Sequence, residues 1–286
     1  MKQIAIVSGK GGTGKTMLTA SFAALSKNAV FADCDVDAAD LHILLEPKIV
    51  ERGEFKGNKV ALINKEKCIS CGACISVCRF DAISEDFVID PLSCEGCGVC
   101  YHICAQNAII MEDKISGEWF VSETKYGPFV HAKLGVAEEN SGKLVSVVRQ
   151  NAKLIAEKEN RDLIIIDGPP GIGCPVISSI TGTDIVLVVT EPTLSGIHDM
   201  QRVIELAQHF KLKVFVVINK YDLNTGMTFE IENYCQKNKI PLAGKIVYDS
   251  IVTEAIANKK IVVEYTNAEV TQQIENIWRT IYNALR

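Results

Sequence analysis

Runs of apolar residues alternate with amphipathic stretches along most of this 286-residue chain. The apolar runs are continuous segments of Val, Ile, Leu and Ala, which is the pattern of strands buried on both faces of a parallel sheet. We predict strands at 3–7, 29–32, 163–166, 184–189, 213–218 and 242–247. Helical periodicity between them predicts helices at 15–27, 143–157, 195–210 and 268–285. This alternation predicts an α/β fold with a mostly parallel sheet flanked by helices.

The alternation is interrupted between residues 60 and 113 by a duplicated, cysteine-rich stretch. Two runs have the spacing C-x2-C-x2-C-x3-C, and each cysteine of the first run recurs 26 positions later. The cysteines are Cys68, Cys71, Cys74, Cys78, Cys94, Cys97, Cys100 and Cys104. We expect a separate domain at 60–113, with pseudo-twofold packing, inserted into a main domain of residues 1–59 and 114–286. Residues 117–133 are expected to form a β-hairpin that leads back to the main domain.

The acidic charge of the chain lies in the same stretch. The net charge is −5, and between residues 64 and 113 eight Asp and Glu stand against three Lys and Arg. Nucleic-acid binding needs clustered Lys and Arg, so we expect no nucleic-acid partner. The first strand follows Met1 and Lys2 directly, and no apolar run reaches membrane-spanning length. We therefore expect a cytoplasmic protein with no membrane partner, in which these cysteines are metal ligands and not disulfides.

A glycine-rich loop joins the first predicted strand to the first predicted helix, with the sequence Gly9-Lys10-Gly11-Gly12-Thr13-Gly14-Lys15-Thr16. In a phosphate-binding loop, backbone N–H groups converge on phosphate oxygens at the start of a helix. Lys15 would contact the β- and γ-phosphates, and Thr16 would ligate Mg²⁺. A glycine turn before a helix is the simpler alternative, and the Gly-Lys-Thr ending argues against it.

Three further segments at predicted strand ends have side chains that suit a nucleotide site. Asp35 follows the second strand, where a carboxylate can order the attacking water. Asp167 ends the strand at 163–166, where it would hold Mg²⁺ through water, and Gly171 could sense the γ-phosphate. Asn219 begins an Asn-Lys-Tyr-Asp segment that matches the guanine-reading motif of GTPases.

The glycine loop contains a second lysine, Lys10, and so resembles the deviant Walker A motif of the MinD/ParA superfamily. That superfamily includes Mrp-type cluster carriers and the nitrogenase iron protein. The resemblance implies an Mg²⁺-dependent ATPase that forms a nucleotide-dependent homodimer, with Lys10 reaching the nucleotide of the partner and Asp35 acting as the switch I aspartate. It further implies that Asn219 reads adenine and that the loop at Tyr248 closes over the base, which favours ATP over GTP. For Lys10, the alternative is a solvated lysine beside a negative ligand.

Each cysteine run has the spacing that seats thiolates around a [4Fe–4S] cluster. The double run resembles bacterial two-cluster ferredoxins, which implies an inserted α+β ferredoxin-like domain. By that resemblance one cluster is bound by Cys68, Cys71, Cys74 and Cys104, and the other by Cys94, Cys97, Cys100 and Cys78. The chain departs from the family at Arg79 and Ala105, where a proline normally follows the fourth cysteine. Zinc is the rival occupant, because Cys-x2-Cys pairs also suit tetrahedral zinc.

The other cysteines and the last helix have simpler interpretations. Cys174 stands at the distance beyond Asp167 at which the nitrogenase iron protein has a cluster-bridging cysteine. A second bridging cysteine has no counterpart here, so we expect a small buried thiol. Cys34 and Cys235 are expected to pack in the core. The apolar stripe at 268–285 is expected to pack on the core, because a membrane-anchoring helix would need more basic residues.

The nucleotide loop and the cysteine runs together predict an ATPase whose nucleotide-dependent dimerisation controls electron transfer through two [4Fe–4S] clusters. The partner would be a redox protein or a protein of metal-cofactor maturation, by functional analogy with the nitrogenase iron protein. Two alternatives remain. One is an Mrp-type carrier that assembles and delivers clusters, and the other is a redox-sensing ATPase that positions other proteins, as MinD and ParA do.

Overall fold

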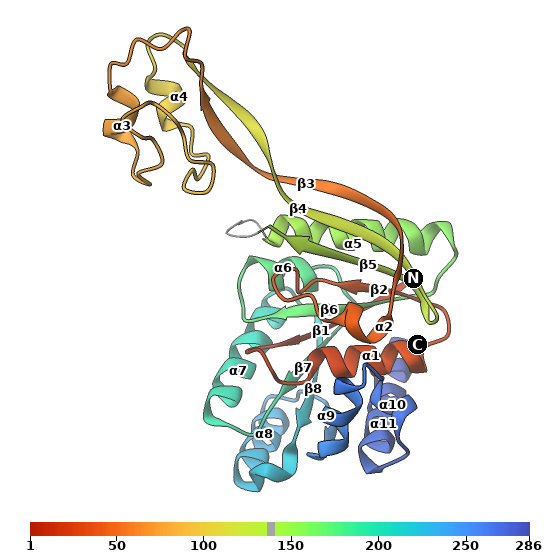
Figure 1. Ribbon diagram of the computed structural model, residues 1–286. Coiled ribbons are helices and arrows are strands. Elements are labelled where there is room, and N and C mark those ends of the chain that lie inside the picture. Colours follow the sequence, from red (N-terminus) through yellow and green to blue (C-terminus); the bar gives the residue numbers. More distant parts are fainter. Residues whose placement is uncertain (136–140) are drawn as a thin grey trace. The chain divides into compact units, whose positions relative to one another are not determined.

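The computed structural model describes residues 1–135 and 141–286, which form two compact units (Figure 1). The larger unit consists of Met1–Arg52, Trp119–Lys133 and Ser141–Arg286, and the smaller unit of Gly53–Glu118 with Leu134 and Gly135. The smaller unit thus begins at Gly53 and not at residue 60, and its main segment extends to Glu118 and not to 113. Both boundaries fall within long strands, β3 (Lys48–Ile63) and β4 (Ile109–Thr124).

The sheet has nine strands in the order β3-β4-β5-β2-β6-β1-β7-β8-β9. The strands not yet introduced are β1 (Lys2–Ser8), β2 (Ala29–Asp33), β5 (Gly127–Leu134), β6 (Leu163–Pro170), β7 (Ile185–Thr190), β8 (Lys213–Asn219) and β9 (Leu242–Ile246). In the part of the sheet with the order β5-β2-β6-β1-β7-β8-β9, each pair of neighbouring strands is parallel. The predicted α/β fold with a mostly parallel sheet is therefore confirmed.

The turn between β4 and β5 consists of Lys125 and Tyr126, and these two strands are neighbours in the sheet. The Thr124 hydroxyl donates to the Gly127 carbonyl (2.7 Å) and accepts from the Tyr126 and Gly127 backbone N–H groups (3.1 and 3.2 Å), which closes the turn. The expected hairpin is thus present. Its first strand is longer than expected because it begins at Ile109.

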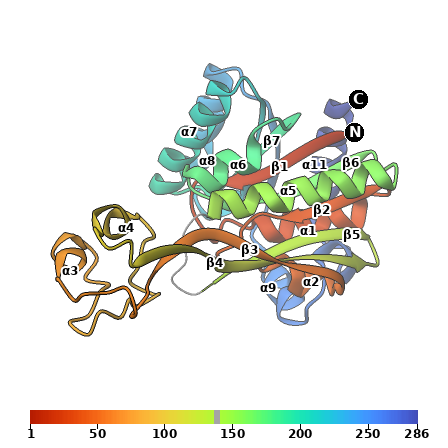
Figure 2. The ribbon, with the colours of Figure 1, turned by 90° about the horizontal axis from the view of Figure 1, so that it is seen from above.

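Helices cover both faces of the parallel strands (Figure 2). They are α1 (Lys15–Leu25), α2 (Leu41–Leu45), α5 (Ser141–Lys158), α6 (Cys174–Ile180), α7 (Leu194–His209), α8 (Thr225–Lys237), α9 (Ser250–Ala257), α10 (Val262–Tyr265) and α11 (Glu269–Leu285). Successive side chains of a strand point to opposite faces, so Ile4 and Ile6 of β1 lie on the same face of the sheet. On that face they pack in the main core together with residues of α1 and α11.

The last helix, α11, packs against the core as expected. The Trp278 ring is 8% exposed and its centroid lies 5.0 Å from that of Phe22 on α1. Val270, Ile274 and Ile281 on the same stripe are fully buried. Among the described residues, no helix is both long enough and apolar enough to span a bilayer.

The 26-residue repeat of the sequence is also a repeat of backbone conformation. Within the smaller unit, α3 (Ala73–Val77) and α4 (Val99–Ile103) each follow a glycine in the left-handed region, Gly72 (φ 76°) and Gly98 (φ 73°). The left-handed pair Ser70 and Gly96, and the pair Asp81 and Asn107, have the same spacing. Ile83 and Ile109 occupy equivalent positions in a small buried core. These observations agree with the expected pseudo-twofold packing.

Candidate functional site

The loop between β1 and α1 presents its backbone to open space. Gly12 and Gly14 have left-handed φ values of 78° and 91°, which favour glycine. A Cβ atom at Gly11 or Gly12 would meet nothing within 4 Å, so a phosphate can approach the backbone N–H groups there. At Gly14 a Cβ atom would lie 2.4 Å from Asn219 Nδ2, so glycine is also required by close packing.

A cleft of about 600 Å³ opens beside this loop, within the larger unit. The cleft brings together three of the predicted segments: the glycine loop, the loop after β2 and the chain after Asp167. Its lining includes Gly11, Gly12, Gly14, Lys15, Thr16, Asp35, Pro169 and Pro170. The register explains the meeting, because Asp33 of β2 and Ile6 of β1 are both opposite Asp167 of β6 at the same edge of the sheet.

Asp167 is buried and accepts two hydroxyl hydrogen bonds. Thr16 Oγ1 donates to Oδ2 at 2.8 Å, and Thr19 Oγ1 donates to Oδ1 at 2.9 Å. Burial raises the pKa of Asp167, and the Lys15 ammonium and the two hydroxyl groups oppose that rise. Carboxylate and hydroxyl oxygens are ligands that Mg²⁺ accepts, so Thr16 and Asp167 could hold this ion together. Thr19 is a contact that the sequence analysis missed, although its position one turn after Thr16 was a usable sign.

Asp35 faces the cleft because Asp33 orders the loop behind it. The buried Asp33 carboxylate accepts from the Asp35 and Leu41 backbone N–H groups at 3.1 and 3.2 Å. Burial raises the pKa of Asp35 to about 6, and the neighbouring Lys15 opposes the rise. Asp35 could therefore exchange a proton or order water at the cleft.

Lys10 points toward residues after β7. Its Nζ lies 3.3 Å from Thr193 Oγ1, 3.4 Å from Ser195 Oγ and 3.8 Å from Glu191 Oε2. Lys220 Nζ bonds the other Glu191 oxygen at 2.6 Å. Among the described residues, the lining of the cleft does not include Lys10. Glu191, which joins the two lysines, was not predicted from the sequence.

In the described part of the chain, the cleft lining does not include three predicted residues that lie outside the glycine loop, Asn219, Tyr248 and Gly171, nor Gly9 and Thr13 of the loop itself. Asn219 is 4% exposed, its Nδ2 donates to the Thr13 carbonyl (2.9 Å), and its Oδ1 accepts from the Lys220 backbone (3.0 Å). Tyr248 is half exposed, and its backbone N–H donates to Asp222 Oδ1 (2.7 Å). The Gly171 N–H donates to the Ser8 carbonyl (2.9 Å). Base reading by Asn219 and Tyr248, and phosphate sensing by Gly171, stay predictions.

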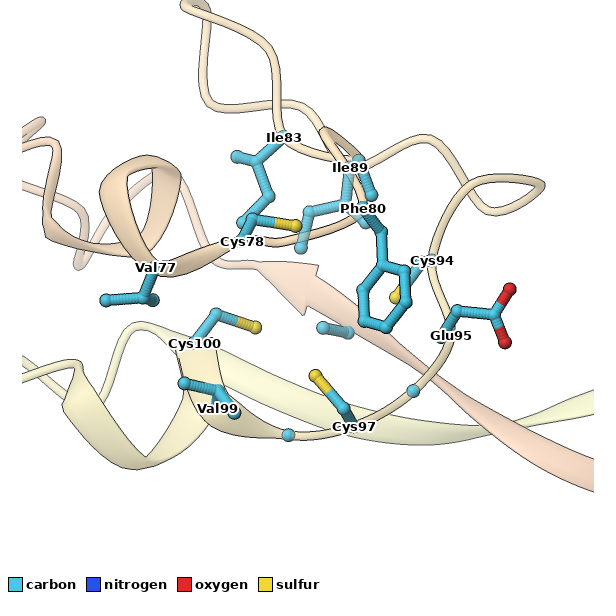
Figure 3. A pocket seen from close by; sticks show the side chains of 14 residues that line it. Val77, Cys78, Phe80, Ile83, Ile89, Cys94, Glu95, Cys97, Val99 and Cys100 are labelled. Atoms are coloured by element: carbon cyan, nitrogen blue, oxygen red, sulfur yellow. The ribbon is translucent and has the colours of Figure 1, made fainter.

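Each of two cavities in the smaller unit is lined by four cysteines. The first, which we call the Cys94 cavity, is lined by Cys78, Cys94, Cys97 and Cys100. Their sulfur atoms turn toward a common space (Figure 3). The second, the Cys68 cavity, is lined by Cys68, Cys71, Cys74 and Cys104. Each cavity therefore combines three cysteines of one run with the last cysteine of the other run.

The remaining lining of both cavities is largely apolar, and it includes Ala61, Ile83 and Ile89 in one and Ile63 and Ile109 in the other. In the Cys68 cavity, the Ala108 backbone N–H donates to Cys104 Sγ at 3.3 Å. No group of three or more His, Cys, Asp or Glu side chains in the described residues converges as it would around a single metal ion.

The expectation of a buried thiol at Cys174 is wrong, because this residue is exposed. It is the first residue of α6, directly after the loop of Gly171 and Gly173, and Pro175 beside it lines the cleft. The preceding Gly173 is exposed as well, so the start of α6 lies at the surface. Cys34 (0% exposed) and Cys235 (2% exposed) are buried as expected.

The glycine loop joins the first strand of a parallel sheet to the helix that follows it. The threonine of that loop is hydrogen-bonded to a buried Asp in β6. These two features define a P-loop nucleotide-binding protein. The sequence matches the CobQ/CobB/MinD/ParA nucleotide-binding domain over residues 4–263. The chain belongs to this family, and solved members include a cell division ATPase MinD and a ParA family ATPase.

Individual relatives extend this likeness over almost the full length. The uncharacterized protein MJ0578 of Methanocaldococcus jannaschii is 38% identical over 283 residues, 98% of this chain and 96% of that protein. MinD of Pyrococcus horikoshii, solved as a complex with Mg-ADP, has a TM-score of 0.61 at 18% identity, over 98% of this chain and 95% of that chain. MinD of Aquifex aeolicus, solved as a MinC:MinD complex, has a TM-score of 0.61 at 19% identity, over 99% and 96%.

Proposed function

We propose that this protein is an Mg²⁺-dependent ATPase that couples nucleotide-dependent dimerisation to electron transfer through two [4Fe–4S] clusters. The observation that carries the proposal is the grouping of eight cysteines into two cavities of four, in a chain that also has a P-loop site. Each half of the proposal has its own support.

The nucleotide half is supported by the composition of the cleft. Lys15 would neutralise the β- and γ-phosphates, and Thr16 with Asp167 would hold Mg²⁺. Burial raises the pKa of Asp35 and the nearby Lys15 ammonium opposes that rise, so Asp35 lies close enough to Lys15 to order water near the γ-phosphate. The Mg-ADP complex of the MinD relative from Pyrococcus horikoshii favours adenine nucleotides.

Dimerisation is supported by the position of Lys10. In a single chain this lysine lies outside the cleft lining, on Glu191 and two hydroxyl groups, where it is 33% exposed. A lysine that leaves this contact could neutralise the nucleotide of a second copy. We infer that Lys10 would complete the partner's site and not its own.

The cluster half is supported by the match between the cavities and the thiolates that two-cluster ferredoxins need. The Cys68 cavity would seat one cluster and the Cys94 cavity the other. Thiolates around a four-iron core stand farther apart than those around one ion, which suits open cavities rather than a tight tetrahedron. When bound, such clusters accept and release single electrons. Because the cavities exchange their last cysteines, loss of one site would disturb the other, which favours electron transfer over cluster delivery.

Two observations favour other candidates. The family match favours a redox-sensing ATPase that positions other proteins, as MinD and ParA do. The exposed Cys174 favours a carrier in which a labile cluster lies between two chains. The first candidate predicts ATP hydrolysis that responds to oxidation without net electron delivery. The second predicts loss of transferable iron on substitution of Cys174.

The proposal is tested by anaerobic redox titration with EPR detection, without nucleotide, with ADP and with a non-hydrolysable ATP analogue. We expect two [4Fe–4S] signals and a nucleotide-dependent midpoint shift of ~60 mV, or about 1.4 kcal/mol for one electron. The Lys15→Ala variant is the control, because it should keep both signals and lose the shift. Equal midpoints in all three states would contradict redox coupling, and absence of the signals in iron-loaded protein would contradict the cluster assignment.

A further inference from the structure

The 26-residue repeat allows the two cysteine cavities to be compared position by position. At two equivalent positions the residues differ in polarity. Phe80 lines the Cys94 cavity where Gln106 lines the Cys68 cavity, and Glu95 lines the Cys94 cavity where Ile69 lines the other. The cavities therefore have the same cysteine arrangement and different surroundings.

Phe80 gives the Cys94 cavity an apolar side chain at the position where its counterpart has an amide. Its ring lies beside the cavity near Cys94 and Cys97 (Figure 3). A cluster gains one negative charge when it is reduced, and an apolar neighbour stabilises that charge less than an amide does. Gln106 has N–H donors at the equivalent position. This pair favours reduction on the Cys68 side.

Glu95 has an effect of the same sign. Glu95 borders the Cys94 cavity and its carboxylate turns away from the four sulfur atoms (Figure 3), yet its negative charge still opposes the addition of negative charge there, whereas Ile69 has no charge. Glu95 is exposed, so water weakens this repulsion without removing it. On the Cys68 side, the Ala108 N–H donates to Cys104 Sγ at 3.3 Å, and a hydrogen bond to a ligand sulfur favours the reduced state.

We propose that the two cysteine cavities are electronically inequivalent, with Phe80 and Glu95 giving the Cys94 cavity the more negative reduction potential. This inference rests on the proposed function, because it requires both cavities to bind clusters. A single electron on the smaller unit would then reside mainly on the Cys68 side.

The test is a redox titration of the iron-loaded full chain, with EPR detection of both clusters. The Glu95→Gln variant removes the charge and keeps the size of the side chain. We expect this variant to raise the lower of the two midpoint potentials. At a fixed solution potential, the ratio of reduced to oxidised cluster at that site should become about two- to fivefold larger. The higher midpoint should stay within error. The variant thus also identifies which signal belongs to the Cys94 cavity.

Two matched variants sharpen the result. Ile69→Glu adds a carboxylate at the equivalent position and should lower the higher midpoint potential. The ratio of reduced to oxidised cluster at that site should fall by a similar factor. Phe80→Gln should raise the lower midpoint, with no change in iron content. A Glu95→Gln variant that shifts the higher midpoint, or neither, would overturn the inference and leave the proposed function intact. Iron-loaded wild-type protein without cluster signals would overturn both.

Discussion

At the scale of single residues, several polar side chains near the nucleotide site stabilise the segments that would contact the ligand. The Asn219 side chain donates a hydrogen bond to the Thr13 carbonyl. The Asp33 carboxylate accepts hydrogen bonds from two backbone N–H groups in the segment that follows it. Glu191 bonds both Lys10 and Lys220. Because these groups are satisfied within the chain, the glycine loop and Asp35 are arranged before a nucleotide arrives, which lowers the entropy cost of binding.

Asp35 predicts a pH dependence of stability. Its pKa of about 6, against an ordinary value of 3.8, results from burial, and Lys15 opposes the rise. The folded protein keeps a proton that the unfolded chain has already released, so this group stabilises the fold at low pH. That contribution is lost as the pH rises through about 6.

The Asp35→Asn variant cannot lose a proton, so its Tm should rise relative to wild type between pH 4 and 7. Solvent screens the half-buried group, and we expect a gain of about 2–4 °C. Calorimetry of nucleotide-free protein measures it. Asp37→Asn, at an exposed neighbouring position, is the control for loss of a carboxylate. A Tm difference that does not change with pH would contradict the proposed burial cost at Asp35.

At the scale of elements, the smaller unit is built from two copies of one short motif. A left-handed residue, a glycine and a one-turn helix recur at Ser70, Gly72 and α3, and again at Gly96, Gly98 and α4. The glycines of this motif do not tolerate a side chain equally. A Cβ atom at Gly96, whose counterpart in the repeat is Ser70, would lie 2.2 Å from the Lys59 carbonyl oxygen on β3. A Cβ atom at Gly72, whose counterpart is Gly98, would meet nothing within 4 Å.

The Gly96→Ala variant should therefore destabilise the smaller unit more than Gly72→Ala. Both substitutions place alanine in the left-handed region, at a cost of about 1–2 kcal/mol. Gly96→Ala should cost about 1–3 kcal/mol more, because backbone atoms must move. Hydrogen exchange of residues 53–118, followed by mass spectrometry, measures the local free energy of opening. Equal loss of protection in the two variants would show that contact with β3 does not restrict Gly96.

At the scale of the whole molecule, one chain combines a P-loop unit and a cysteine-rich unit, and β3 and β4 both continue from one into the other. At these two crossings the chain is therefore regular β-strand. The proposed coupling requires that a change in the P-loop unit, such as dimerisation, reaches the cysteine cavities. Dimerisation is the step that can be tested independently of any cluster.

We expect the Lys10→Gln variant to bind nucleotide with near wild-type affinity but to dimerise at least about tenfold more weakly with an ATP analogue. The reason is that the substitution leaves a phosphate charge at the interface without its lysine partner. The loss of such a contact costs roughly 1.4 kcal/mol or more of dimerisation free energy. Light scattering after size-exclusion chromatography measures the dimer, and a fluorescent nucleotide measures affinity. Lys15→Gln is the contrasting variant, because it should lose nucleotide binding first. A Lys10→Gln protein that dimerises normally would exclude a role for Lys10 across the interface.

Local patterns of the sequence were enough to predict most of the larger unit. The strands β1, β2, β6, β7 and β8 each contain a continuous apolar run, as strands buried on both faces require, whereas the run in β9 is interrupted by Gly244 and Lys245. The glycine loop needed φ values that few other residues adopt. The strand β3 could not be predicted in the same way, because most of its side chains are exposed and its partner β4 lies far along the chain.

The sequence by itself determined the fold class, the phosphate-binding loop and the 26-residue cysteine repeat, because each depends on residues close together in the chain. Only the tertiary structure decided which way particular side chains turn. It placed Lys10 on residues after β7, Asn219 on the glycine loop and Cys174 at the surface. The contacts of Lys10 and Asn219 join segments that are roughly two hundred positions apart, and the exposure of Cys174 depends on what surrounds the start of α6. No local pattern specifies such contacts, because their energies depend on how the whole sheet brings its loops to one edge.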